Sequence, residues 1–127
     1  MSDALTSDFG ADDLVALRRD VERYAAGHGL AELALYRFVV AVNELTTNAV
    51  RHGGGTGRLE LRRTGGVLRC RVTDHGPGLP SGRRSDVPPA QRAVNGRGLW
   101  LVRQIAVSLD IDSHPSGTSV TLTTQVA

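Results

Sequence analysis

The sequence predicts an α+β fold, a two-layer α/β sandwich in which helices cover one face of a mixed, mostly antiparallel sheet. Two long stretches repeat apolar residues at spacings of three and four, as amphipathic helices do. Two short stretches alternate apolar and polar residues around a Thr-Gly-Gly turn, and two more flank a Pro-Ser-Gly turn. Helices beside such hairpins form two layers around one core.

The first helix is predicted over about residues 12–28. Its apolar residues recur on one face: Leu14, Leu17, Val21 and Tyr24. Asp12 and Asp13 suit the positive end of the helix dipole, and Gly27 and Gly29 should end the helix. No element is predicted before residue 12.

The second helix is predicted over about residues 31–52, up to three glycines that break it. Its apolar stripe is formed by Leu35, Phe38, Val42, Leu45 and Ala49. A second stripe lies nearly opposite and is formed by Arg37, Ala41, Glu44, Asn48 and Arg51. Residues four apart on a helix lie one above the other, so Glu44 and Asn48 project together. A carboxylate and an amide one turn apart on a core helix suggest that something polar binds there.

Two hairpins and a third helix complete the predicted elements. The first hairpin has strands over residues 58–63 and 67–73, and the second over 109–113 and 118–124. A helix over about 99–108 precedes the second hairpin. Before that helix, the stretch from Asp74 to Asn95 holds all but one of the prolines and shows little periodicity. This pattern predicts a long mobile loop, of the kind that is usually functional in a compact domain.

Length and composition limit the class of protein. The 127 residues predict a single domain, 1–127, and no apolar run reaches the roughly 20 residues that span a bilayer. One cysteine excludes an internal disulfide, and the start MSDALTSDFG lacks a secretory signal pattern, so we expect a cytoplasmic protein. All 15 basic residues are arginines, but they are scattered and the net charge is only +2. Neither nucleic acid nor a membrane is therefore an expected partner.

Three short motifs each have an ordinary structural explanation when taken alone. The segment 74–78, DHGPG, is compatible with a turn, and 96–98, GRG, with a loop that enters a helix. Glu44 and Asn48 are compatible with a solvated helix face. Their order and positions instead favour a nucleotide site. An aspartate at a strand end can accept a hydrogen bond from an exocyclic amine, and free N–H groups at a helix start suit phosphate. Asn48 can ligate magnesium, and Glu44 can accept a proton.

The same motifs resemble those of the GHKL ATPases, which have the Bergerat ATP-binding fold. ELTTNAVRHG, residues 44–53, resembles the N box of that family, DHGPG the first glycine box, and GRGLWLV, residues 96–102, the second. The resemblance covers about residues 12–124. The form E-L-x-x-N-A-x-x-H-G and the small size are most similar to the anti-sigma-factor serine/threonine kinases. The resemblance implies that the loop forms an ATP lid at about 78–95.

The resemblance also implies a role for each matched residue. Glu44 would be the general base that orients or deprotonates the attacking hydroxyl, and Asn48 would ligate a magnesium ion. Asp74 would bind the adenine amine, with support from Thr118. The other implied contacts to ATP lie in the glycine boxes, with Gly76 and Gly78 at the adenine and Gly96, Gly98 and Leu99 at the phosphates. Arg97 departs from the family pattern, which commonly has a small apolar residue there; contact with a phosphate is favoured over a solvent-facing position.

By this resemblance the chain is expected to be an Mg-ATP-binding anti-sigma regulator. It would phosphorylate a serine or threonine of an anti-anti-sigma partner, sequester a sigma factor and form a homodimer. Two alternatives share the fold: a non-catalytic ATP-binding module that only sequesters a protein, and a stand-alone histidine-kinase-like catalytic domain. Glu44 favours catalysis over sequestration alone, because a binding module does not need a base.

Overall fold

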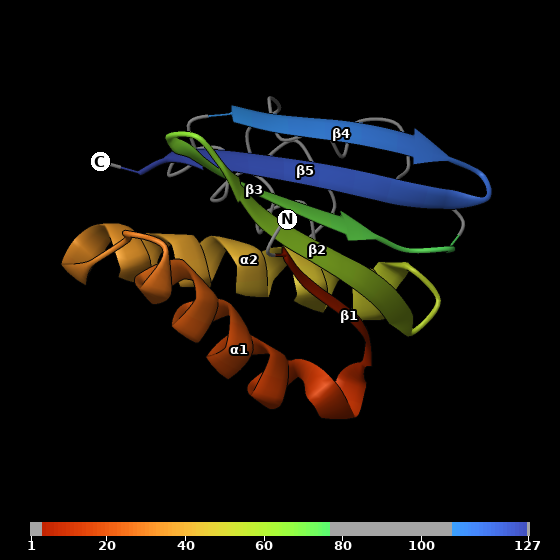
Figure 1. Ribbon diagram of the computed structural model, residues 1–127. Helices are drawn as coiled ribbons and strands as arrows, with labels where there is room; N and C mark the ends of the chain where they lie inside the picture. The colour runs from red at the N-terminus through yellow and green to blue at the C-terminus, as the bar shows by residue number, and fades with distance from the viewer. Residues whose placement is uncertain (1–3, 77–107, 127) are drawn as a thin grey trace, which may run out of the picture.

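The computed structural model describes residues 4–76 and 108–126 (Figure 1). A short 3-10 helix at Ala11–Asp13 joins the first strand to the first helix. The elements in chain order are β1 (Ala4–Gly10), α1 (Leu14–Gly27), α2 (Glu32–His52), β2 (Thr56–Thr64), β3 (Val67–Thr73), β4 (Ser108–His114) and β5 (Gly117–Gln125).

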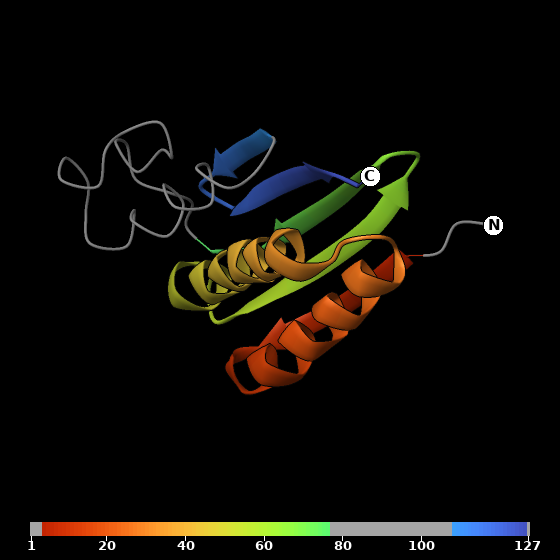
Figure 2. The same ribbon diagram turned by 90° about the vertical axis from the view of Figure 1, so that its left-hand side faces the viewer.

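The five strands form one sheet in the order β1-β2-β3-β5-β4. Every neighbouring pair among the described strands is antiparallel, so the parallel pairing implied by a mixed sheet is not found in this part of the chain. Both helices lie on the same face of the sheet (Figure 2). The predicted two-layer α+β sandwich is therefore confirmed. Neither described helix is long and apolar enough to cross a membrane.

The structure adds one strand to the predicted elements and corrects two predicted boundaries. β1 was not predicted, although Leu5 and Phe9 lie on alternate positions of it and Phe9 is buried. Its pairing partner β2 lies some fifty residues later in the chain, with Leu5 opposite Leu61, so no neighbouring hairpin indicated this strand. The first α-helix starts at Leu14 and not at residue 12. Ser108 begins β4 and so is not helical; the rest of the predicted third helix lies outside the described residues.

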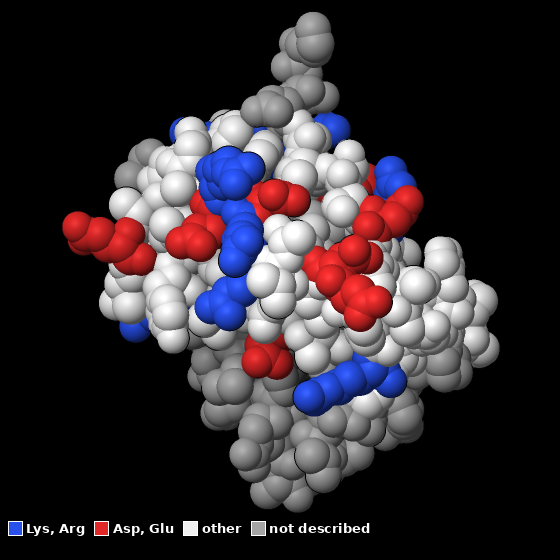
Figure 3. All heavy atoms as spheres, turned by 90° about the horizontal axis from the view of Figure 1, so that it is seen from below, with Lys and Arg blue, Asp and Glu red and all other residues white. Residues whose placement is uncertain are grey.

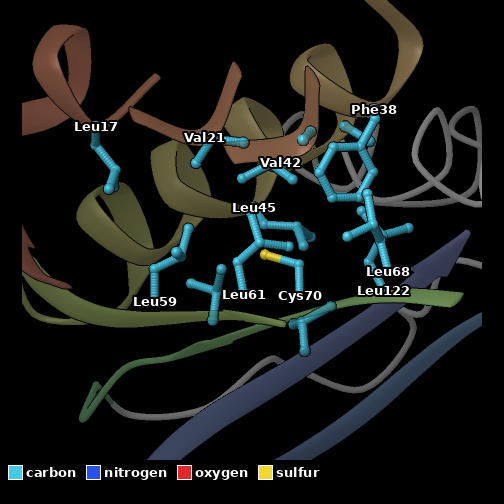
Figure 4. Packing of buried hydrophobic residues seen from close by; sticks show 14 of the residues in the cluster. Leu17, Val21, Phe38, Val42, Leu45, Leu59, Leu61, Leu68, Cys70 and Leu122 are labelled. Carbon is cyan, nitrogen blue, oxygen red and sulfur yellow. The ribbon is translucent and has the colours of Figure 1, made fainter. Parts of the chain in front are cut away.

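The core fills the space between α2 and the middle of the sheet (Figure 4). Leu45 of α2 projects towards Leu61 of β2 and Cys70 of β3, which the register places opposite one another. All three side chains are almost completely buried. Burying a leucine side chain stabilises a fold by about 1.5–3 kcal/mol. These contacts hold α2 across the sheet and so fix the position of its other faces.

One residue of the predicted polar stripe is buried. Ala41 is 1% exposed, whereas Glu44 and Asn48 are half-buried and Arg51 is exposed. The helical wheel was wrong for Ala41 because α2 lies flat on the sheet and also packs against α1, which widens its buried stripe. Glu44 and Asn48 therefore lie at the border of the core and not on a fully solvated face.

The buried thiol of Cys70 supplies a test of this core. Burial raises the pKa of Cys70 from 9.0 to about 12. We expect iodoacetamide to leave the native protein unmodified at mildly alkaline pH and to alkylate it once guanidinium unfolds it. The folded thiol keeps its proton where the unfolded one ionises, so the free energy of unfolding should fall as the pH rises above 9.0. Equal alkylation rates with and without guanidinium would contradict this packing.

Candidate functional site

Two polar side chains of α2 lie at the border of the core. Glu44 and Asn48 are both half-buried on this helix, one turn apart. The Asn48 side-chain nitrogen, Nδ2, is buried and has no hydrogen-bond partner among the described residues. A buried polar group without a partner costs about 1–3 kcal/mol, so it indicates a position kept for a ligand. Because no hydrogen bond from the described residues holds Nδ2, rotation of the amide can present Oδ1, the kind of oxygen that Mg²⁺ binds.

Asp74 follows the last residue of β3, and its carboxylate is held in one orientation. Its Oδ1 accepts hydrogen bonds from the backbone N–H of Gly76 at 3.0 Å and of Thr118 at 3.2 Å. Its own N–H donates to the Thr118 carbonyl at 2.8 Å, which extends the β3–β5 ladder by one residue. No hydrogen bond within the described residues uses Oδ2. One carboxylate oxygen is thus fixed by the backbone, and the other can accept a bond from a ligand.

Thr118 contacts Asp74 through its backbone. Its N–H donates to Oδ1 of Asp74, and its carbonyl accepts a hydrogen bond from the Asp74 N–H. The Thr118 hydroxyl lies 3.0 Å from the hydroxyl of Ser113. Its buried side chain therefore joins β4 to β5 and is not part of the Asp74 contact.

Three glycines allow the chain to pack closely around Asp74. A β-carbon on Gly53 would overlap the Asp74 side chain, and one on Gly117 would overlap the Asp74 carbonyl. A β-carbon on Gly76 would lie 2.6 Å from the carbonyl oxygen of His52 at the end of α2. The end of α2, the end of β3 and the start of β5 meet at this point. The sequence analysis treated Gly53 only as a helix breaker and Gly117 only as a turn residue. Gly53 stands in ELTTNAVRHG, the stretch that resembles the N box, and this was the available signal for it.

Gly53, at the end of α2, gives a reference point for the positions of Asn48 and Glu44 along the helix. Each helical residue advances about 1.5 Å along the axis, so Asn48 lies roughly 7.5 Å and Glu44 roughly 13.5 Å from Gly53. Since Gly53 contacts Asp74, the carboxylate of Asp74 is at one end of this line and Glu44 at the other. The predicted residues outside the described ranges are Gly78, Gly96, Arg97, Gly98 and Leu99, together with the lid at 78–95.

The described part of the site contains no preformed cluster of metal ligands. Among residues 4–76 and 108–126, no three His, Cys, Asp or Glu side chains are grouped so that they could hold a metal ion. A hard cation that kept most of its ligands from phosphate and water would need only one or two protein oxygens. The amide of Asn48 would fit this kind of Mg²⁺ site as a protein ligand.

The packing around Gly53 gives a direct test of the site's construction. Replacing Gly53 by alanine should force Asp74 away from the helix end, and overpacking of this kind typically costs 1–3 kcal/mol or more. We expect a lower midpoint of thermal unfolding and weaker ligand binding at the Asp74 carboxylate. Gly27→Ala is the matched control, because no atom lies within 4 Å of its added methyl group. A Gly53→Ala protein as stable as Gly27→Ala would show that the contact is not tight.

Comparisons with known proteins agree with this architecture. Residues 10–124 match the profile of the histidine kinase-like ATPase domain. No curated protein matches the sequence significantly. A structure of the RsbU and RsbW domains of Rv1364c from Mycobacterium tuberculosis aligns with a TM-score of 0.75 and 21% identity over 98% of this chain, which spans only 33% of that chain. The catalytic domain of the histidine kinase ThkA aligns with a TM-score of 0.62 and 14% identity, covering 96% of this chain and 97% of that domain.

A third similar structure is the histidine kinase domain of a blue-light-activated kinase from Erythrobacter litoralis. It has a TM-score of 0.54 and 26% identity over 73% of this chain and 48% of its own. Because the profile match covers most of the sequence, the chain belongs to the histidine kinase-like ATPases, the GHKL group. The resemblance inferred from the three motifs is confirmed. This fold implies ATP binding, usually with Mg²⁺, and activity of a kinase or ATPase type.

Proposed function

We propose that the chain is an Mg-ATP-dependent anti-sigma regulator that phosphorylates a serine or threonine of an anti-anti-sigma partner and sequesters a sigma factor. The observation that carries this proposal is the position of Glu44, half-buried and one turn from Asn48, whose buried Nδ2 has no hydrogen-bond partner among the described residues. A carboxylate at that place can accept a proton beside the metal-bound phosphates, and phosphoryl transfer depends mainly on such positioning.

Each described residue has a distinct task in this proposal. Asp74 accepts a hydrogen bond from the adenine amine through Oδ2, because the backbone already holds Oδ1. Asn48 would hold a magnesium ion through Oδ1, and the ion would supply neutralisation of phosphate charge. Glu44 takes the proton of the attacking hydroxyl. The glycines at 53, 76 and 117 keep Asp74 in place.

The presence of a base favours a hydroxyl acceptor over a histidine acceptor. A serine or threonine hydroxyl must lose its proton as the phosphoryl group arrives, so a nearby carboxylate assists it. A neutral imidazole already has a nitrogen lone pair available at physiological pH. The alignment with the RsbW-containing structure, which covers nearly the whole chain, is consistent with this choice, although histidine kinases share the same fold.

The test is transfer of labelled phosphate. The purified chain is incubated with Mg²⁺, ATP labelled at the γ-phosphate, and candidate sigma-factor regulators from the same genome. We expect label on a partner protein that survives acid and is lost in alkali, as phosphoserine and phosphothreonine behave. Label that is lost in acid and survives alkali marks phosphohistidine and supports the histidine-kinase-like alternative. ATP binding and partner capture without any transfer support the module that only sequesters a protein.

The role of Asn48 gives a separate prediction. Asn48→Ala should weaken ATP binding by about tenfold or more when Mg²⁺ is present, because a metal ligand is lost. With EDTA in place of Mg²⁺, the variant and the wild type should bind ATP almost equally. Titration calorimetry under the two conditions measures both affinities. Asn43→Ala, a change of the same kind on the same helix, is the control. An equal loss with and without Mg²⁺ would make Asn48 a structural residue.

A further inference from the structure

The face of the sheet that the helices leave uncovered carries a cluster of arginines. Alternation along β2 and β3 places buried leucines and Cys70 towards the helices and the opposite set towards this open face. Arg62, Arg69 and Arg71, here called the arginine cluster, belong to that opposite set and are exposed. Figure 2 shows both helices on the other side of the sheet. The cluster is therefore accessible and separate from Glu44 and Asn48.

Within the described residues the arginine cluster forms no ion pair, although Glu60 lies directly opposite Arg71 in the β2–β3 register. Arg62 and Arg69 are directly opposite in the β2–β3 register, where β-carbons are about 4.5–5.5 Å apart and like charges are destabilising. No ion pair in residues 4–76 or 108–126 involves a member of the cluster. By contrast, Arg58 on the same face pairs with Asp8 at 3.1 Å. Arg62 and Arg69 thus remain a like-charge pair with no ion pair in the described residues, whereas Arg58 has a carboxylate partner.

The cluster is also partly oriented in advance. Nε of Arg71 donates to the hydroxyl of Ser119 on β5 at 2.8 Å. That bond uses one of five N–H donors and leaves the terminal nitrogens for another partner. Orienting a guanidinium before binding lowers the entropy that a partner must overcome.

The cluster lines a shallow hollow of about 450 Å³. The hollow contains the three arginines and two carboxylates, so its net charge is +1. The two carboxylates are Glu60 and Asp110, and the other polar lining residues are Thr6, Thr64 and Thr121. The only large hydrophobic side chain on the open face of β3 is Val67, at 37% exposure. A partner for this surface must therefore bring charge and hydrogen-bond groups, not an apolar face.

We propose that this hollow docks an extended acidic segment of a partner protein. Arg69 and Arg71 are two residues apart on one strand, hence roughly 7 Å apart. Carboxylates on alternate residues of an extended peptide have the same spacing, and each can accept a two-pronged hydrogen bond from a guanidinium. A carboxylate lying between Arg62 and Arg69 would also remove the repulsion across the strands. This inference does not depend on the proposed kinase activity.

The probe is an eight-residue fluorescein-labelled peptide of alternating glutamate and threonine, followed by fluorescence anisotropy. The same peptide with glutamine for glutamate is the uncharged control. We expect binding of the glutamate peptide only, with a loss of tenfold or more in the double variant Arg62→Gln/Arg69→Gln. The matched control is Arg18→Gln/Arg19→Gln, which removes the same charge from exposed positions of α1. On the helix side, basic and acidic side chains are interspersed (Figure 3).

The unfolding temperature supplies a second readout. If the arginine cluster had a purely structural role, replacing its members would lower this temperature. The Arg62→Gln/Arg69→Gln protein should unfold at the same or a higher temperature, since a like-charge pair is removed. Weaker peptide binding together with equal or greater stability supports docking. The proposal is overturned if both double variants lose affinity equally, if the glutamine peptide or a polyuridylate RNA binds as well as the glutamate peptide, or if the Arg62/Arg69 variant is markedly less stable.

Discussion

Replacing Glu44 by glutamine is expected to slow phosphoryl transfer to the partner by roughly 10²- to 10⁴-fold, the usual contribution of a general base. Glutamine keeps the volume and the half-buried position of Glu44 but cannot accept a proton at neutral pH. ATP binding should change little, because the adenine and metal contacts are assigned to Asp74 and Asn48. The measurements are transfer rate by γ-phosphate label and ATP affinity by calorimetry.

The selectivity of this effect separates a base from a structural residue. Glu22→Gln on the exposed part of α1 is the control and should leave the transfer rate unchanged. Partner capture should survive in the Glu44→Gln protein, since sequestration needs no proton transfer. If Glu44→Gln transfers phosphate as fast as the wild type, Glu44 is not the base and the proposed mechanism fails.

Replacing Asp74 by asparagine should reduce ATP affinity tenfold or more. The two backbone N–H groups that donate to Oδ1 require an oxygen at that position. The amide oxygen of asparagine must therefore take the place of Oδ1, and its NH₂ group then occupies the place of Oδ2. A donor would face the donating adenine amine, and a mispaired buried group costs about 1–3 kcal/mol. Each 1.4 kcal/mol is a factor of about ten in affinity.

Thr118→Val is the informative companion to Asp74→Asn. It keeps the backbone N–H that bonds to Asp74 and removes only the hydroxyl that pairs with Ser113. We expect some loss of stability and a far smaller loss of ATP affinity than Asp74→Asn shows. Calorimetric affinities that are equal for wild type and Asp74→Asn would remove Asp74 from the adenine site.

The local patterns of the sequence predicted the elements that carry most of the site. The alternation of Leu59 and Leu61 against Leu68 and Cys70 gave the first hairpin, and those side chains are indeed buried on one face. The spacing of three and four gave α2, and with it the shared side of Glu44 and Asn48. These predictions succeeded because periodicity of 2 or about 3.6 residues is a property of neighbouring positions in the chain.

The residues that the sequence analysis missed depend on partners far away in the chain. β1 is a strand because β2 pairs with it, and its own few apolar residues would not have predicted it. Ala41 is buried because of how α2 lies against the sheet and α1, which no helical wheel contains. In both cases the deciding contact is with another element.

The sequence by itself determined the α+β class, the main helix with its polar pair, the hairpins and the membership of the GHKL ATPases. Only the tertiary structure decided how the Asp74 side chain is held: Gly53 must lack a side chain, and the N–H of Thr118, 44 positions away, donates to Oδ1. It also decided that Arg62, Arg69 and Arg71 share one open face and form no ion pair within the described residues. Close backbone approach and cross-strand register arise from packing, and packing brings together residues that no local pattern relates.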